Sequence, residues 1–446
     1  MLTIPAGADF ILCRLFDAGF DAYVVGGCVR DSLLGLTPHD WDVCTNARPD
    51  EMQRVFADCR VIETGLKHGT LTILYDHVPY EVTTFRVDGS YTDHRHPDHV
   101  EFVTDIIDDL SRRDFTINAM AWNPRCGLVD AFGGQEDLKA GVIRAVGDPA
   151  TRFNEDALRI LRALRFASVF GFAIEENTAK AAFGLRDTLA DVAAERIRVE
   201  LSKLLCGKGA AEILRTYADI VFVILPQLRV MRGFEQHNPH HCYDVWEHTL
   251  HALPNVPPTE TMRLSILLHD TGKPDCFTTD AQGIGHMHGH EFRSAEIALD
   301  VLNALRIDNA TRDRVTLLVR SHHLSVSTDP KLLRRRLNQL GEEALRQLLQ
   351  LWRADQLGKG TMSEEEIEAT YAANVAALDA LMATVPCFSL KQLAVSGRDL
   401  LAAGIPAGQR IGQTLSFLLD GVMAEQLPNE KESLLAAAKK FAASQK

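Results

Sequence analysis

The sequence predicts an α/β front part followed by a mostly helical remainder, and two patterns along the chain support this division. Residues 1–143 alternate short strands with short helices, as in "DAYVVGG", "WDVCT", "GTLTILY" and "YEVTTFR". After residue 143, apolar residues recur at spacings of three and four, the pattern of amphipathic helices. A chain of 446 residues is also too long for one compact core, so we expect several domains.

Composition narrows the class of protein. The chain is 46% hydrophobic and 24% charged, which is ordinary for a globular protein, and no apolar stretch reaches the length of about 18 residues expected of a membrane span. The N-terminus lacks the basic start and apolar region of a signal peptide. Nine scattered cysteines without a C-x-x-C pair fit reduced thiols in the cytoplasm better than a disulfide framework or a zinc ribbon. The net charge of −13 argues against indiscriminate coating of nucleic acid, although a local basic surface would suffice to bind one.

The stretch "VVGGCVRDSLLGLTPHDWDVCT", residues 24–45, predicts a strand, a tight turn, a short helix, a loop and a second strand. Gly26 and Gly27 at the helix start offer backbone N–H groups to an anion, and Arg30 adds a charged fork suited to phosphate. A glycine pair alone is also consistent with an ordinary turn.

Three carboxylates are the candidate catalytic groups. Strand alternation would place Asp40 and Asp42 on one face, about 7 Å apart, where they repel unless a cation lies between them. They could hold Mg²⁺ ions that bridge a triphosphate and an attacking hydroxyl, as in two-metal nucleotidyl transfer. Glu81, in the middle of a predicted strand, is the candidate third carboxylate. The alternatives are a solvated strand end for the aspartates and a structural salt bridge for Glu81.

The segment "NEDALRILRALRFA" predicts a helix that presents a carboxylate beside a guanidinium. Asp156 and Arg159 lie three residues apart and would share a helix face, while Leu158, Leu161 and Leu164 form an apolar stripe. An acceptor beside donors can pair with the edge of cytosine or adenine, whereas guanine and uracil offer the wrong order of groups. The alternative for these two side chains is a surface ion pair.

These motifs resemble those of the class II tRNA nucleotidyltransferase and poly(A) polymerase family, specifically the bacterial CCA-adding enzymes. The similar stretches cover nearly all of residues 20–206 in family order: "VVGGCVRDSLLG", "HDWDVCT", "TGLKHGT", "YEVTTFR", "RRDFTINAMAW", "DAFGG" and "NEDALRILRALRFA". The resemblance implies a small mixed sheet as the catalytic head and a helical neck that reads the incoming base. It assigns metals to Asp40 and Asp42 and base reading to Asp156 and Arg159. The partners it implies are tRNA, CTP and ATP.

Several basic residues join the expected nucleotide site. In "SRRDFT", Arg112 and Arg113 are expected to help bind the triphosphate, and Asp114 to position their loop. Four arginines of the predicted neck could contact tRNA phosphates or be solvated helix charges: Arg162, Arg165, Arg196 and Arg198.

The segment "VDGSYTDHRHPDHVEFV", residues 87–103, separates related activities. It resembles the flexible loop that CCA-adding members need for the final adenosine, and poly(A) polymerases carry a different segment here. The sequence therefore favours CCA addition over poly(A) synthesis, and leaves an enzyme that adds only the final A as an alternative.

Histidines concentrate in one part of the chain, with eleven of the seventeen between His237 and His323. The stretches "QHNPHHCYDVWEHTLHAL", "LSILLHDTGKP", "GIGHMHGHEFRSAE" and "VRSHHLS" resemble an HD domain, named for its adjacent His-Asp ligands. The resemblance implies six ligands: His248, His269, Asp270, His290, His322 and Asp355. Imidazole with carboxylate suits a transition metal such as Ni²⁺ or Mn²⁺, and a bound metal could support phosphoester hydrolysis. A role only in shaping RNA binding is the alternative.

We therefore expect a head at 1–143, a neck at 144–235, an HD domain at 236–360 and a helical tail at 361–446, for which tRNA contact is a hypothesis. The leading function is template-independent building or repair of the tRNA 3′ CCA end from CTP and ATP. The alternative of another class is an HD-domain metal phosphohydrolase with an RNA-binding front half.

Overall fold

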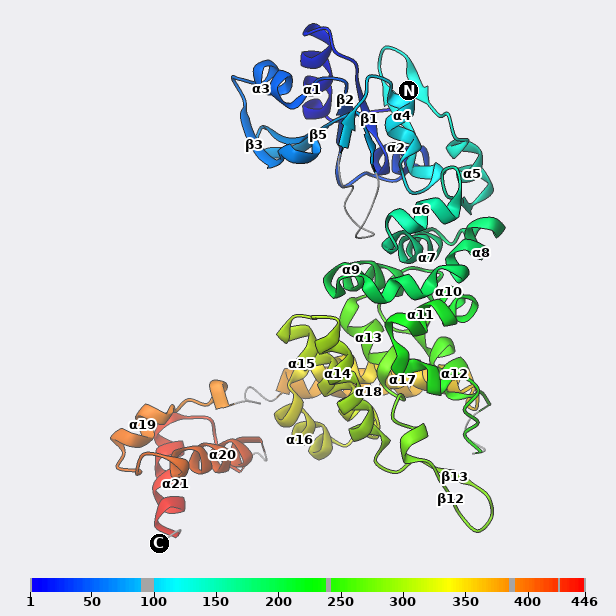
Figure 1. The fold of residues 1–446 in the computed structure, drawn as a ribbon. Coiled ribbons are helices and arrows are strands. Elements are labelled where there is room, and N and C mark those ends of the chain that lie inside the picture. Colours follow the sequence, from blue (N-terminus) through cyan, green and yellow to red (C-terminus); the bar gives the residue numbers. More distant parts are fainter. Residues whose placement is uncertain (1, 90–99, 238–241, 385–389, 424–425, 445–446) are drawn as a thin grey trace. The chain divides into compact units, whose positions relative to one another are not determined.

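The computed structural model describes residues 2–89, 100–237, 242–384, 390–423 and 426–444 (Figure 1). The chain divides into two compact units, Met1–Pro226 with Ala304–Arg306, and Gln227–Asn303 with Ile307–Lys446. The finer division into four domains stays a prediction.

A seven-stranded mixed sheet forms the front of the first unit, in the order β3-β4-β5-β2-β1-β8-β9. Strands β2 and β5 are parallel, and the other neighbours in the sheet are antiparallel. The predicted small mixed sheet is confirmed. Its strands are β1 (Ala22–Val25), β2 (Asp42–Thr45), β3 (Arg60–Gly65), β4 (Thr70–Tyr75), β5 (Val78–Thr84), β8 (Ala121–Asn123) and β9 (Gly127–Val129).

Short helices surround this sheet (Figure 1): α1 (Ala6–Asp17), α2 (Gly27–Leu33), α3 (Pro49–Val55), α4 (Ile106–Ser111) and α5 (Gly134–Ala140). Helix α4 contributes Ile106 and Leu110 to a core that also contains Val25 and Cys44 of the sheet. A small hairpin of β6 (Arg86–Asp88) and β7 (Val100–Phe102) follows β5. Burial of these alternating apolar positions holds the strand ends that carry the candidate site.

Six helices form the rest of the first unit: α6 (Pro149–Glu155), α7 (Leu158–Phe170), α8 (Glu176–Gly184), α9 (Ala194–Leu205), α10 (Ala210–Thr216) and α11 (Ala218–Ile224). The predicted stripe on α7 is buried, since Leu158 is 6% exposed and Leu161 and Leu164 are fully buried. Helix α7 packs against α9. The strands β10 (Val142–Ile143) and β11 (Ala173–Ile174) pair in parallel beside these helices.

Two local predictions are wrong. Strand β2 begins at Asp42, so Asp40 lies in the preceding loop rather than on the same strand face. Asp156 lies between α6 and α7 with extended backbone (φ −144°, ψ 103°), so it does not share a helix face with Arg159. The carboxylate of Asp156 accepts a hydrogen bond from the backbone nitrogen of Leu158, which favours a new helix start over a continuous helix.

The second unit is mostly helical, as predicted. Its helices are α12 (Val245–Ala252), α13 (Glu260–Leu268), α14 (His290–Ala304), α15 (Asn309–Ser321), α16 (Pro330–Leu340), α17 (Glu342–Lys359), α18 (Glu364–Thr384), α19 (Gly397–Ala402), α20 (Gln409–Met423) and α21 (Lys431–Ser444), with a hairpin of β12 (Thr278–Thr279) and β13 (Gly285–His286). Helices α19–α21 share their own apolar core, which includes Leu400, Leu418 and Leu434. Within the described ranges, no helix is long and apolar enough to cross a membrane.

One glycine sets the distance between α12 and α17. A Cβ atom on Gly358 would lie 2.8 Å from the Cβ of Ala252 and 2.9 Å from the carbonyl oxygen of His248. Contacts this short leave no room for a side chain, so the two helices can approach this closely only because residue 358 is glycine. The approach brings Asp355 of α17 to His248 of α12.

Candidate functional site

The turn after β1 requires glycine. Gly26 has φ +74° and ψ −125°, a backbone conformation that residues with a side chain rarely adopt. A Cβ atom there would also lie 2.8 Å from Nη1 of Arg113. The predicted glycine turn, including Gly27 at the first position of α2, therefore lies against one of the predicted triphosphate-binding arginines.

The parallel pairing of β2 with β5 brings two of the predicted catalytic carboxylates to one face of the sheet. Val43 is opposite Val82, and both are fully buried. Asp42 and Glu81 precede these valines on adjacent strands, so both point to the other face, where they are exposed. Asp40 is exposed in the loop just before β2.

These three carboxylates affect one another electrostatically. Partial desolvation raises the pKa of Asp42, and the negative charges of Glu81 and Asp40 raise it further, whereas the Arg113 guanidinium lowers it. In the part of the chain that the structure describes, the three do not form a group whose ligand atoms all lie within 4.8 Å of one another. The site therefore gathers negative charge that the neighbouring residues only partly neutralise.

Asp109, which the sequence reasoning missed, holds both predicted triphosphate-binding arginines. Its carboxylate is fully buried, with Oδ1 at 2.7 Å from Nη2 of Arg112 and Oδ2 at 3.3 Å from Nη2 of Arg113. Burial opposes ionisation of Asp109, but the two guanidiniums together keep its pKa below the ordinary value. The signal was present in the sequence, because a carboxylate three and four residues before two arginines on a helix can reach both.

The Arg30 guanidinium forms hydrogen bonds with an amide and a carboxylate and packs on two aromatic rings. Nη1 donates to Oδ1 of Asn118 at 2.6 Å and Nε donates to Oδ1 of Asp31 at 2.8 Å. The guanidinium lies over the rings of Phe166 and Phe170, 5.1 and 4.9 Å from their centroids. These contacts give Arg30 a structural role between α2 and α7, and its contact with phosphate stays a prediction.

Asp114 connects the loop after α4 to helix α7. Its Oδ2 accepts hydrogen bonds from Nε and Nη2 of Arg162 at 2.8 and 2.5 Å, and its Oδ1 accepts one from Asn118. Although burial opposes ionisation, Arg162 holds the pKa of Asp114 well below its usual range. Arg165 forms an ion pair with Glu200 of α9. Arg162 and Arg165 are thus members of a partly buried ion-pair network rather than solvated helix charges.

The predicted base-reading residues are each paired with a different partner. Oδ2 of Asp156 lies 2.7 Å from Nη2 of Arg196, and Oδ1 lies 3.2 Å from Nη1. Nη1 of Arg159 lies 2.5 Å from Glu155, and Nη2 donates to the carbonyl oxygen of Arg112 at 3.1 Å. The side chains of Asp156 and Arg159 remain 17% and 12% exposed. Arg196 was not foreseen as a partner, since 40 residues separate it from Asp156.

The predicted loop at residues 87–103 lies largely outside the described residues, because 90–99 are not among them. Its two ends pair as β6 and β7, with Arg86 opposite Phe102. Its expected part in the final adenosine addition stays a prediction.

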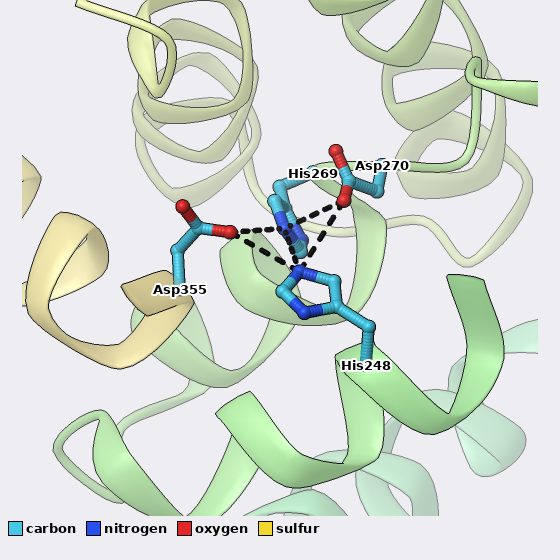
Figure 2. A group of neighbouring side chains, drawn as sticks. All are labelled: His248, His269, Asp270 and Asp355. Atoms are coloured by element: carbon cyan, nitrogen blue, oxygen red, sulfur yellow. Dashed lines mark hydrogen bonds and ion pairs between the residues drawn. The ribbon is translucent and has the colours of Figure 1, made fainter. Parts of the chain in front are cut away.

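Four of the six predicted metal ligands converge in the second unit (Figure 2). Nε2 of His248, from α12, lies 3.3 Å from Nε2 of His269, 3.4 Å from Oδ2 of Asp270 and 3.1 Å from Oδ1 of Asp355. Nε2 of His269 lies 3.2 Å from Oδ2 of Asp270 and 3.5 Å from Oδ1 of Asp355. Two imidazoles and two carboxylates at these separations form a group that could hold a metal ion.

The other two predicted ligands lie beside this group. His290, the first residue of α14, and His322, directly after α15, form a second possible metal-binding group with Asp270. Another histidine of the same part of the chain, His286, pairs with Asp280 and is not in either group. All six ligands inferred from the sequence are therefore brought together around Asp270.

The protonation of each histidine in the cluster depends on the charges of its neighbours. Burial opposes protonation of His269, but Asp270 and Asp355 together raise its pKa to about 9. Burial and the neighbouring His269 lower the pKa of His322 to about 3. Without a metal ion, a proton on His269 thus partly offsets the two carboxylates.

Two lysines that the sequence reasoning missed form ion pairs with aspartates of the cluster. Nζ of Lys273 lies 2.7 Å from Oδ2 of Asp270, and Nζ of Lys359 lies 2.5 Å from Oδ2 of Asp355. Their spacing of three and four residues from the aspartates was a usable signal. Both lysines line a cavity of about 370 Å³ that also exposes His290 and His322.

Comparisons with known proteins give matches in both units of the chain. Residues 22–144 match the model of the poly A polymerase head domain, residues 171–228 match the "Probable RNA and SrmB- binding site of polymerase A", and residues 292–438 match a tRNA nucleotidyltransferase domain 2. The CCA-adding enzyme of Levilactobacillus brevis is 36% identical over 435 residues, which cover 96% of each chain. The chain belongs to the CCA-adding enzyme family.

Other CCA-adding enzymes extend this result. That of Leuconostoc mesenteroides is 52% identical over 220 residues, 49% of this chain and 54% of that enzyme. The crystal structure of the Bacillus stearothermophilus CCA-adding enzyme in complex with CTP covers all of this chain and 99% of its own, with a TM-score of 0.71 and 27% identity. The Thermotoga maritima CCA-adding enzyme shares the fold, with a TM-score of 0.57 and 22% identity. The predicted family and enzyme class, a nucleotidyltransferase, are confirmed, while the HD-domain assignment stays a prediction.

Replacing Asp114 by Ala should destabilise the first unit, because it leaves the partly buried Arg162 guanidinium with only the longer ion pair to Glu200, at 3.6 Å. Removing one partner of a buried pair costs about 3–5 kcal/mol, and we expect the lower end or less because a third of the Arg162 side chain is exposed. Thermal unfolding measures the effect. Asp50→Ala, which removes an exposed ion pair with Arg54, is the control, and equal unfolding temperatures for the two variants would contradict the prediction.

Proposed function

We propose that this chain adds CCA to the 3′ end of tRNA without a template, using CTP and ATP, in the cytoplasm. The observation that carries the proposal is the electrostatic effect of Glu81, Asp40 and Arg113 on Asp42, with Arg113 against the glycine turn, in a chain of the CCA-adding family. The nucleotide CTP is the ligand named for the Bacillus stearothermophilus structure, which this fold matches over its full length. Scattered cysteines without a C-x-x-C pair support the cytoplasmic location.

In this reaction the 3′ hydroxyl oxygen of the RNA attacks the α-phosphorus of the nucleotide. The bond between that phosphorus and the oxygen leading to the β-phosphorus breaks, and pyrophosphate leaves while the hydroxyl gives up its proton to solvent water. Oxygen ligands suit Mg²⁺, and ions bound by Asp40 and Asp42 would neutralise charge on the triphosphate and the attacking oxygen. Arg113 favours the ionised form of Asp42 that such binding needs.

The residues proposed to handle the nucleotide are fixed before it arrives. Arg112 and Arg113 are held by Asp109 and offer positive charge to the triphosphate. Asp156 is held by Arg196, and Arg159 is held by Glu155. A carboxylate and a guanidinium held in this way form a rigid template for the edge of cytosine or adenine, because little side-chain entropy remains to be lost on binding.

Replacing Asp42 by Ala should reduce nucleotide addition at least roughly 10²-fold, because the site loses a ligand for the ions that stabilise transition-state charge. The assay follows labelled CTP and ATP on tRNA lacking CCA. Asp50→Ala, an exposed aspartate on α3, should keep wild-type activity. Ordinary turnover by Asp42→Ala with both nucleotides would reject the catalytic assignment.

Replacing Asp156 or Arg159 by Ala should weaken the choice among CTP, ATP, GTP and UTP. Each bidentate contact contributes about 1–3 kcal/mol of discrimination, so the preference should fall roughly 5- to 150-fold. Selectivity ratios from competition assays measure this effect. Arg215→Ala, which removes an exposed ion pair with Glu212, is the control, and unchanged selectivity in both test variants would rule out base reading by these residues.

We propose metal-dependent phosphoester hydrolysis as a second function of the chain, at the HD-type cluster. The supporting observation is that the two imidazole nitrogens lie 3.3 Å from each other and 3.1–3.5 Å from the oxygens of Asp270 and Asp355. These distances are close to the edges of roughly 3.3–3.4 Å in a tetrahedron with metal–ligand distances of about 2.0–2.1 Å. Imidazole and carboxylate together favour Ni²⁺, Mn²⁺ or a similar ion over Mg²⁺. Such an ion would supply Lewis acidity for attack of water on phosphorus.

The double variant His269→Ala, Asp270→Ala should lose bound transition metal and any phosphatase or phosphodiesterase activity that depends on it. CCA addition in Mg²⁺ should persist, because the head carboxylates belong to the other unit. Metal content by mass spectrometry, circular dichroism and both activity assays test this. His251→Ala, an exposed histidine on the same helix as His248, is the control, and an unchanged metal content in the double variant would remove the ligand assignment.

A further inference from the structure

We propose that Asp109 is a positioning residue that couples the β6–β7 hairpin to Arg112 and Arg113, so that a bound triphosphate and an ordered hairpin stabilise each other. This link rests on the nucleotide addition proposed above, and it gives the hairpin a part in triphosphate binding.

The two oxygens of the buried Asp109 carboxylate have different partners. Oδ1 accepts hydrogen bonds from Nη2 and Nε of Arg112, at 2.7 and 3.1 Å, and one from the backbone nitrogen of Arg86 at 3.3 Å. Oδ2 accepts from Nη2 of Arg113 at 3.3 Å, and the Cys44 thiol donates to it over 3.6 Å. One side chain therefore contacts two arginines, strand β2 and the first residue of β6.

The start of β6 is held through its backbone. The N–H of Arg86 donates to Asp109, and the carbonyl oxygen of Arg86 accepts a hydrogen bond from Nε of Arg112 at 3.0 Å. Arg86 pairs with Phe102 of β7, so these two bonds affect both strands of the hairpin. Because Nε of Arg112 is shared between Asp109 and Arg86, a displacement of this guanidinium changes the hold on β6.

The hairpin also packs on the turn before β4. The ring of Phe102 lies over Gly69, since a Cβ atom on this glycine would be 2.6 Å from Cε1 of the ring. The Arg86 side chain donates from Nη1 to the carbonyl oxygen of His68. These contacts involve neither of the arginines expected at the triphosphate. Phe102 is therefore a position at which the hairpin can be perturbed without touching those arginines.

Arg113 has donors to offer a phosphate. Its Nε is buried and has no hydrogen-bond partner among the described residues, and its Nη1 lies against the Gly26 turn. A buried donor without an acceptor costs stability, so an incoming acceptor oxygen is favoured. In the group of Arg112, Arg113 and Asp109, two guanidiniums against one carboxylate leave one positive charge in excess. A triphosphate, with several negative charges and acceptor oxygens, matches this excess.

Ordering of the arginines and ordering of the hairpin are therefore linked. A phosphate bound by Arg112 and Arg113 restricts both guanidiniums, so less conformational entropy remains to be lost when Asp109 and Arg112 hold Arg86. The effect is reciprocal, because an ordered hairpin keeps Asp109 and Arg112 in place for the phosphates. A nucleoside monophosphate lacks the β- and γ-phosphates and should have a smaller effect.

Amide hydrogen exchange in the hairpin tests the link on the full chain. Saturating CTP with Mg²⁺ should slow exchange in the backbone of β6 and β7 roughly 5-fold or more, whereas CMP should slow it less. Asp109→Asn keeps the size of the side chain and removes its charge, and should abolish the response at saturating CTP. Asp108→Asn, at an exposed aspartate of the same helix, should respond like the wild type.

A double-mutant cycle tests the reciprocal effect. Phe102→Ala should weaken CTP binding about 5-fold in the wild-type background and leave it unchanged in the Asp109→Asn background, where the link is already broken. Calorimetric titration with CTP and with CMP measures both affinities, and the affinity for CMP should not respond to Phe102→Ala. Glu101→Ala, at an exposed residue of β7, is the control.

Unchanged hairpin exchange in the CTP-bound wild type would overturn the proposed link, as would equal slowing by CMP and CTP. Equal losses of CTP affinity from Phe102→Ala in both backgrounds would also overturn it. Absence of CTP binding by the wild type would instead reject the proposed nucleotide addition. If Asp109→Asn does not fold, Arg112→Lys replaces it, because lysine keeps the charge but has no Nε–H to share between Asp109 and Arg86. The wild-type exchange with CTP and CMP decides independently of any variant.

Discussion

The pairing of Asp114 with Arg162 joins the loop that follows α4 to helix α7, which contains Arg159 and begins just after Asp156. Burying a carboxylate is costly unless a cation and hydrogen bonds compensate it, and Arg162 with Asn118 provides both. The same loop gives the carbonyl oxygen of Arg112 to Arg159. These contacts, with the packing of Arg30 on Phe166 and Phe170, hold the start of α7 beside the loop that carries Arg112 and Arg113.

The two candidate metal sites differ in how exposed and how closely spaced their carboxylates are. In the head, Asp40 in the loop before β2, Asp42 at the start of β2 and Glu81 within β5 are exposed and are not gathered tightly, which suits ions that arrive and leave with a triphosphate. In the second unit the ligands are buried and held close by helix packing that depends on Gly358. Imidazoles oriented by backbone carbonyls make that site suited to ions that stay.

Much of this arrangement follows from local sequence. Strand and helix periods, the glycine turn and the leucine stripe on α7 depend on neighbours within a few residues, so the α/β head and helical remainder could be predicted. Residue types also indicated the chemistry, because the order of histidines and aspartates in the second unit resembles that of an HD domain, and this resemblance identified the candidate metal ligands. Predictions from local sequence failed at two aspartates. The hydrogen bond from the backbone nitrogen of Leu158 to the carboxylate of Asp156 interrupts the predicted helix, and β2 begins only at Asp42, two residues after Asp40.

Only the tertiary structure decided the partners of these residues. The sequence gives no indication that Asp156 meets Arg196, forty positions away, or that Glu81 lies beside Asp42, because helix packing and strand register set those contacts. The resemblance to an HD domain implied six ligands for one site, but the position of Asp270 between four imidazoles divides them into two groups. The physical reason is that spacing along a chain determines which residues share an element, whereas the burial of apolar faces determines which elements meet.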